Sequence, residues 1–125
     1  MKAPDAAVIA LLRADPIVGP AVGGRISTDM RPGPSCIRVS LIGGGEPFNE
    51  WVRATVQVEC WATDQLVAGQ LAFTVRQRWP LLRGNLDADT HVVGCWVESD
   101  PTFLPDPDSD RPRYLLTVGL TMGQR

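Results

Sequence analysis

The chain has 125 residues, of which 44% are hydrophobic and 21% are charged, and its formal net charge at pH 7 is −2. This length and composition suit one globular domain with a sizeable core, and the weakly acidic balance argues against a free-standing nucleic-acid-binding protein, which would normally present a basic face. No apolar run approaches the roughly 18 residues that cross a bilayer, and Pro4 and Asp5 interrupt what would be a signal-peptide core, so we expect no membrane contact and a cytosolic product.

The N-terminal quarter of the chain predicts one helix followed by shorter segments. Residues 4–14 begin with a proline and an aspartate, which suit a first helical turn, and carry apolar residues at i, i+3 and i+4. Residues 16–22 predict one more short helical turn, which a pair of glycines ends, and residues 25–27 predict a brief extended segment. The prolines of residues 29–35 lack the N–H that a sheet ladder needs, so this segment is expected to be a loop.

Two strands follow. Residues 36–42 alternate between apolar and polar side chains. Residues 51–62 do so over a greater length: every second residue from Val52 to Ala62 is apolar, which predicts a half-buried strand inside a sheet, with neighbours on both sides. Residues 43–50 lie between them and exceed a tight two-residue turn, so we expect a protruding loop there.

Residues 64–79 predict the clearest helix of the chain. Thr63 or Asp64 can cap its first turn, and Pro80 ends it. Its apolar stripe repeats every four residues at Val67, Leu71, Val75 and Trp79.

The C-terminal part predicts two more strands, residues 91–98 and 113–122, which are rich in β-branched and aromatic residues. The connection 100–113 carries several prolines and aspartates and is expected to be an exposed arm. The order helix, strand, strand, helix, strand, strand indicates an α+β fold, in which two layers are formed by a mainly antiparallel sheet of about four to five strands and two helices on one of its faces. We interpret residues 1–125 as a single domain.

Groups that could carry chemistry are sparse. Cys36, Cys60 and Cys95 are an odd number without a C-x-x-C pair, so we interpret them as buried reduced thiols of the core. His91 has no second histidine to share a metal ion, and the acidic run 106–110 lacks the glycine and the glutamate that complete a calcium loop. We therefore predict no catalytic, cofactor-binding or metal-binding residue.

Aromatic residues outside the expected core point instead to a docking surface. Trp51 and Trp61 fall on the polar face of the 51–62 strand, together with Arg53, Thr55, Gln57 and Glu59. A partner subunit could cover that face, and the alternative is that a bulge or the strand ends turn these indoles into the core. Phe48 and Phe103 belong to the two segments that are expected to protrude.

In these segments the chain resembles the tail terminator (tail-completion) proteins of long-tailed bacteriophages, the lambda-type siphophage family, over nearly its full length. The resemblance is carried by DPIVGPAVGGRIS after the first helix, CIRVSLIGGG, VQVECWATDQLVAGQLAFTVRQ, and the closing pair GCWVESDPTFL and RPRYLLTVGLTM. Its strongest piece is residues 56–64, where an alternating strand that ends in a tryptophan runs straight into an amphipathic helix. The acidic, proline-rich residues 101–112 lie outside the pattern that carries the resemblance.

The resemblance implies a non-enzymatic protein of the virion tail neck, assembled in the host cytoplasm without a cofactor. Copies of the chain would form a hexameric ring that caps the head-proximal end of the tail tube, ends tail polymerisation and provides the surface for head–tail joining. Its partners would be the major tail tube protein and the head-closure (stopper) protein, and DNA would pass through the lumen without sequence-specific recognition. Two alternatives stay open: another ring component of the neck or tail, such as a head-closure or minor tail protein, and a small ligand-binding domain or enzyme that uses a pocket between helices and sheet.

Under the ring interpretation, loop 43–50 and arm 100–113 contact neighbouring subunits, the tail tube or the head-side partner. The predicted interface residues are Glu46, Phe48, Trp51, Arg53, Gln57, Glu59, Trp61, Phe103, Asp106, Asp108, Asp110 and Arg111.

Overall fold

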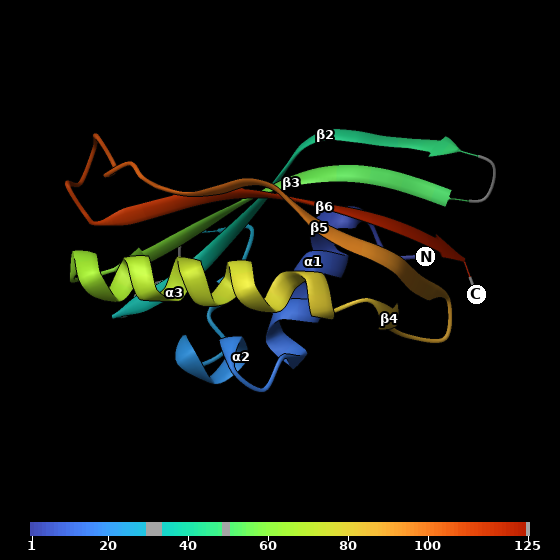
Figure 1. Ribbon diagram of the computed structural model, residues 1–125, viewed down its shortest axis with the longest axis horizontal. Coiled ribbons are helices and arrows are strands. Elements are labelled where there is room, and N and C mark those ends of the chain that lie inside the picture. The colour runs from blue at the N-terminus through green and yellow to red at the C-terminus, as the bar shows by residue number, and fades with distance from the viewer. Residues whose placement is uncertain (30–33, 49–50, 125) are drawn as a thin grey trace.

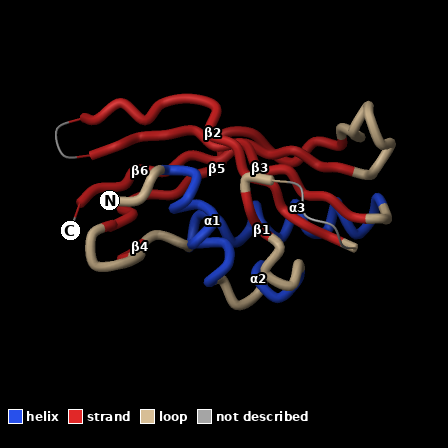
Figure 2. Tube along the Cα trace, turned by 180° about the vertical axis from the view of Figure 1, so that it is seen from behind, coloured by secondary structure: helices blue, strands red, loops and turns tan. Residues whose placement is uncertain are grey.

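The computed structural model describes residues 1–29, 34–48 and 51–124, apart from the side chains of residues 45–48. The elements in chain order are α1 (Pro4–Ala14), α2 (Val18–Ala21), β1 (Ile26–Ser27), β2 (Ser35–Phe48), β3 (Trp51–Ala62), α3 (Gln65–Arg78), the 3₁₀ turn η1 (Trp79–Leu81), β4 (Gly84–Asn85), β5 (Thr90–Phe103) and β6 (Arg113–Gln124). The helices lie on one side of a long, curved sheet (Figures 1 and 2). The fold is α+β.

The strands of the described part of the chain form one sheet in the order β1-β2-β3-β6-β5-β4. β1 runs parallel to β2, and the other four neighbouring pairs are antiparallel. β3 lies inside the sheet, between β2 and β6, and pairs with both along nearly its whole length. The long alternating strand predicted from the sequence therefore has the two neighbours expected of it.

The alternation of β3 decides which face of the sheet is covered. Val56 and Val58 are 0% exposed and Ala54 is 2% exposed, and all three belong to the core beneath the sheet. Since side chains of a strand alternate between faces, the residues between them point to the opposite, outer face. The predicted inward face is confirmed.

The helices close the core from below. α1 buries Val8, Leu11 and Leu12 in the predicted i, i+3, i+4 pattern, and the Asp64 carboxylate accepts the backbone N–H groups of the first turn of α3, as expected of an N-cap. Val67, however, is 53% exposed, so the predicted stripe of α3 is wrong at its first residue. A step of four residues overshoots a full turn by about 40°, and a stripe with that spacing drifts off one helix face.

Trp79, at the end of the same stripe, is completely buried, as predicted. Its indole N–H donates to the carbonyl oxygen of Gly119 in β6 at 3.1 Å. This hydrogen bond satisfies the only polar atom of a large core side chain and ties the end of α3 to the middle of the sheet.

Asp15 joins α1, α2 and α3 through one buried carboxylate. Its side chain is 0% exposed, accepts the backbone N–H of Val18 at 2.9 Å and that of Ile17 at 3.2 Å, and pairs with Arg78 Nη2 at 2.8 Å. Burial by itself raises the pKa of Asp15. The hydrogen bonds from Arg78 and the two backbone N–H groups lower the pKa by a larger amount, so the net pKa lies below the ordinary value.

We expect Asp15→Asn to lower the free energy of unfolding by about 2 kcal/mol at pH 7, because it leaves the half-buried Arg78 without its counter-ion. The folded-state pKa of Asp15 is depressed, so its contribution is complete above about pH 4 and is lost as the pH falls through the folded value. Urea unfolding at pH 7 and near pH 3 should therefore show a difference between wild type and variant that shrinks in acid. Asp64→Asn, which keeps a good N-cap, is the control and should change stability little. A difference that is independent of pH would contradict this role.

The structure corrects the sequence-based outline in number and length of elements. The described residues form six strands rather than four to five and three α-helices rather than two. The short helical turn expected within residues 16–22 and the extended segment expected at 25–27 are α2 and β1, whereas β4 is too short to leave a periodic signal. Residues 43–48 belong to a strand rather than to the expected loop: β2 continues to Phe48, and its register with β3 shifts between Leu41 and Gly43 and between Gly44 and Pro47. Residues 49–50 of the expected loop lie outside the described residues. β5 likewise runs on to Phe103, so the irregular arm is residues 104–112 and not 100–113.

Candidate docking surfaces

The outer face of the sheet carries two tryptophans that rest on glycines of β6. A Cβ atom at Gly119 would overlap the ring of Trp96, and one at Gly123 would overlap the ring of Trp51. The guanidinium carbon of Arg53 lies 4.9 Å from the centre of the Trp96 ring, a cation–π distance. Trp96 thus lies on the outer face of the sheet, and both indoles cover β6 at positions where β6 has no side chain.

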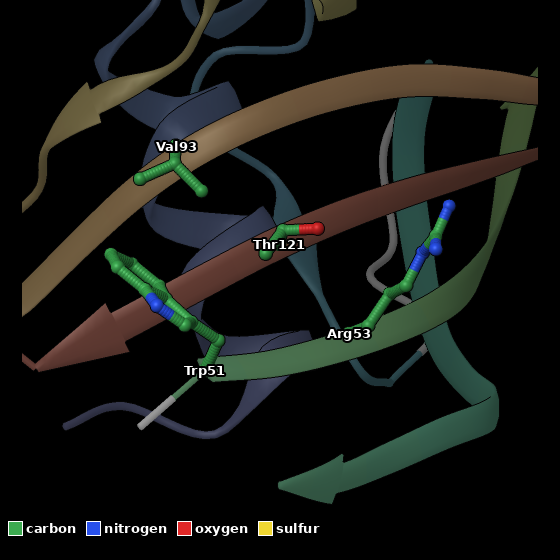
Figure 3. Close-up of a pocket in the computed structure, with 4 residues that line it drawn as sticks. All are labelled: Trp51, Arg53, Val93 and Thr121. Atoms are coloured by element: carbon green, nitrogen blue, oxygen red, sulfur yellow. The ribbon is translucent and has the colours of Figure 1, made fainter. Parts of the chain in front are cut away.

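Trp51 and Arg53 also line a hollow of about 440 Å³, which Val93 of β5 and Thr121 of β6 complete (Figure 3). Figure 3 shows Trp51 leaning towards Val93 while Arg53 extends in the other direction, with Thr121 between them. Trp51 is 36% exposed and Val93 is 38% exposed. These are accessible apolar groups beside a cation, which is the composition of a docking surface.

A second hollow adjoins the first one through Val93. It has a volume of about 370 Å³ and is lined by Arg83, Gly84, His91, Val92 and Val93. His91 Nδ1 lies 2.6 Å from Asn85 Oδ1, so a side chain of β4 orients this imidazole. Together the two hollows suit a partner segment with apolar and acidic side chains.

Farther along the outer face, β3 carries a buried charge cluster. Glu59 is 6% exposed, and its carboxylate lies 3.3 Å from Arg113 Nη1 and 3.6 Å from Arg38 Nη1. Arg113 also covers the ring of Trp61 at 5.2 Å, and Trp61 is 3% exposed. Gln57, the next residue on this face, is half-buried. The chain thus covers Glu59 and Trp61 itself, and their burial requires no partner subunit.

Two hydrogen bonds join the two ends of arm 104–112. The backbone N–H of Leu104 donates to the carbonyl oxygen of Arg113 at 2.9 Å, and Arg113 Nε donates back to the carbonyl oxygen of Leu104 at 2.9 Å. Inside the arm, the hydroxyl of Ser109 donates to Asp106 Oδ2 at 2.6 Å, and this hydrogen bond is the main cause of the lowered pKa of Asp106. Asp110 adopts a left-handed conformation with φ of 55°. The arm is therefore a defined turn that presents acidic side chains.

The arm also presents apolar surface. Phe103 is 38% exposed while it packs against Tyr114 with ring centres 5.3 Å apart, and Leu104 is 49% exposed. Asp108 and Asp110 are exposed, whereas Asp106 and Arg111 are partly covered. The arm thus combines acidic and apolar groups, the composition that the hollows beside Trp51 suit.

The arm and the β2–β3 hairpin lie at opposite ends of the sheet (Figure 1). The hollow beside Trp51 belongs to the hairpin end, since Trp51 pairs with Phe48 there. The side chains of Glu46 and Phe48 lie outside the described residues, so nothing in the structure tests their predicted place in an interface. The interface role of the other ten predicted residues also stays a prediction.

Cys60 and Cys95 are poor nucleophiles. Cys36 and Cys60 are buried as predicted, but Cys95 is only half-buried. Burial raises the pKa of the Cys60 thiol strongly and that of Cys95 to about 12, which keeps both protonated at neutral pH. Within residues 1–29, 34–48 and 51–124, no group of three or more histidine, cysteine or acidic side chains could hold a metal ion.

No helix of the described chain has the length and apolar character needed to span a membrane.

No protein-family model matches this chain, and no curated protein matches it. Among solved structures, the chain is similar to a chain from the virion of a native gene transfer agent particle, with a TM-score of 0.63 and 20% sequence identity. The likeness covers 97% of this chain and 95% of that chain. At this identity it shows a shared fold over essentially the whole of both chains.

Sequence reasoning missed Trp96, Val93 and Thr121 as parts of the outer surface. The signal was present in β6, where Gly119 and Gly123 fall on the same strand face within a run of apolar residues and threonines. Glycine inside a strand often marks the close approach of another group. Here the group is an indole from each neighbouring strand.

Proposed function

We propose that this chain is a structural, non-enzymatic protein of a phage-like virion. In this proposal, copies of the chain form a ring, six to a ring, which caps the head-proximal end of a tail tube and ends its polymerisation. The ring then receives the head-closure protein, and DNA passes through its lumen without base-specific contacts. The observation that carries the proposal is the end-to-end likeness of fold to a chain of a virion particle.

The surface chemistry is consistent with such a ring. An acidic, apolar arm lies at one end of the protomer and a hollow with apolar and cationic lining lies at the other, so the two rims of a ring of such protomers would carry different chemistry (Figure 1). A ring that joins a tail tube on one side to a head-side protein on the other needs two unlike rims. The net charge of −2 also suits a passage that should not hold phosphates strongly.

Tail length tests the proposed role directly. In a phage that lacks this gene, we expect tail tubes that continue beyond their normal length, because nothing stops their polymerisation. Electron micrographs of negatively stained lysates give the length distribution, and supplying the wild-type gene in trans should restore it. Tails of normal length that fail to join heads would contradict termination and favour the second candidate, a head-closure or other neck ring protein, which the same likeness supports.

The mass of the protein in solution distinguishes the two ring candidates from a small ligand-binding domain or enzyme. A ring predicts about six chain masses in light scattering of the concentrated protein. A monomer at all concentrations would contradict a self-assembling ring.

A further inference from the structure

Both edges of the sheet are left open over most of their length. β1 pairs with β2 only at Ile37 and Arg38, and β4 pairs with β5 only at Val92 and His91. Beyond these residues, neither long strand has a second strand neighbour within the described chain. An unpaired edge is a row of free N–H and C=O groups that can pair with another chain.

Within the described residues the accessible edge of β2 is short, because Val39 is 0% exposed and a β-bulge follows Leu41. The backbone N–H of Ile37 donates to Arg25, on the β1 side, so by the alternation of a strand Val39 and Leu41 also direct their N–H and C=O groups away from β3. Residues 39–44 carry no charge, and Leu41 and Ile42 are 43% and 53% exposed. Soluble proteins commonly guard such an edge with lysine, proline or a covering segment.

The open part of β5 is similar and lies at the same level of the sheet. Residues 93–97 carry no charge. Following the register across the sheet, Leu41 pairs with Val56, Val56 with Val118, and Val118 with Val97. Because β1 and β4 cover opposite ends of their edges and are only two residues long, the middle of both edges has no strand neighbour among the described residues.

The strand directions make the two edges complementary. Three successive antiparallel pairings separate β2 from β5, so these strands run in opposite directions. A second copy placed beside the first in the same orientation therefore brings its β5 antiparallel to β2, with its helices on the same side of the joined sheet. The contact joins two different edges, so each copy can bind one neighbour on each side.

We infer that the occupant of the β2 edge is a second copy of this chain, whose β5 continues the sheet from one subunit to the next. This inference rests on the proposed ring and names the contact that builds it. The ring wall would then be a continuous sheet with its helices on one surface. The arm and the hollow, at opposite strand ends, would face the two rims of the ring (Figure 1).

Leu41→Pro tests the inference, because proline removes an outward N–H without removing any hydrogen bond to β3. Leu41→Ala is the matched control, since it shortens the side chain but keeps the N–H. With a wild type that forms a ring, we expect the proline variant to fall to one chain mass in light scattering and the alanine variant to keep the ring. The thermal unfolding of each variant, measured in dilute monomeric samples, should show that both are folded.

A second measurement keeps the inference testable if Leu41→Pro fails to fold. A photo-cross-linking amino acid at position 41, in rings mixed from unlabelled and ¹⁵N-labelled chains, should form links between copies to residues 93–100. Links to any other element, or a ring that persists in Leu41→Pro, would overturn the edge contact and leave the proposed ring standing. A wild type that never forms rings would overturn both.

Discussion

Replacing Val56 by aspartate is expected to prevent this chain from folding. Val56 is 0% exposed and sits in the central strand, where the helices cover the sheet. An unpaired carboxylate in such a core costs several kcal/mol, about the whole stability of a small domain, which is roughly 5–15 kcal/mol. Circular dichroism and the yield of soluble protein would reveal the loss. Val58→Asp, on the same face, should have the same effect.

Val93→Asp is the matched control, because it makes the same chemical change at a residue of β5 that is 38% exposed. There the carboxylate stays hydrated, and the free energy of unfolding should change by about 1 kcal/mol or less. A Val56→Asp protein with a normal melting transition would show that the covered face of the sheet is assigned to the wrong set of residues.

Deleting residues 104–110 is expected to impair assembly and leave the fold intact. The deletion leaves Arg111, Pro112 and Arg113 to link Phe103 to Tyr114, a length that strand connections accept. The removed residues are almost all exposed, so the free energy of unfolding should fall by only about 1 kcal/mol. The readouts are the melting temperature of the free protein and the ability of the variant to restore normal tails in a phage that lacks the gene.

A milder variant separates the charge of the arm from its shape. Replacing Asp106, Asp108 and Asp110 by asparagine keeps the length of the loop, and asparagine tolerates the left-handed conformation at position 110. If the arm acts through its carboxylates, the triple variant should assemble more weakly than wild type, and added salt should reduce the difference. Normal tails from both the deletion and the triple variant would remove the arm from the assembly surface.

The sequence predicted the elements that have a clear period and missed those defined by geometry. β3, α1 and α3 were predictable because each extends over eleven or more residues, long enough to show the alternation of a strand or the repeat of a helix. The extension of β2 through Gly43 and Gly44 could not be predicted, because glycine has no side chain that could show a pattern. The strand continues there only because β3 offers a pairing partner. The two-residue strands β1 and β4 exist for the same reason, through pairing rather than propensity.

The candidate surface was predictable only in part. Alternation correctly assigned Trp51, Arg53 and Gln57 to the outer face. It could not show that Arg113, more than fifty residues later in the chain, would cover Glu59 and Trp61, because that contact arises from the pairing of β3 with β6. The open edges are likewise invisible in the sequence, since strand order is set by the whole fold.

Gly119 is held from both sides of the sheet: the indole of Trp96 lies on its outer surface, and Trp79 donates to its carbonyl oxygen from below. Any side chain at this position would displace the Trp96 ring and, with it, the guanidinium of Arg53. We therefore expect substitutions of Gly119 and Trp96 to occur together in related chains. Related chains that carry alanine or a larger residue in place of Gly119 should have a small residue in place of Trp96, whereas the tryptophan below can persist, because its partner is a backbone atom that every residue supplies.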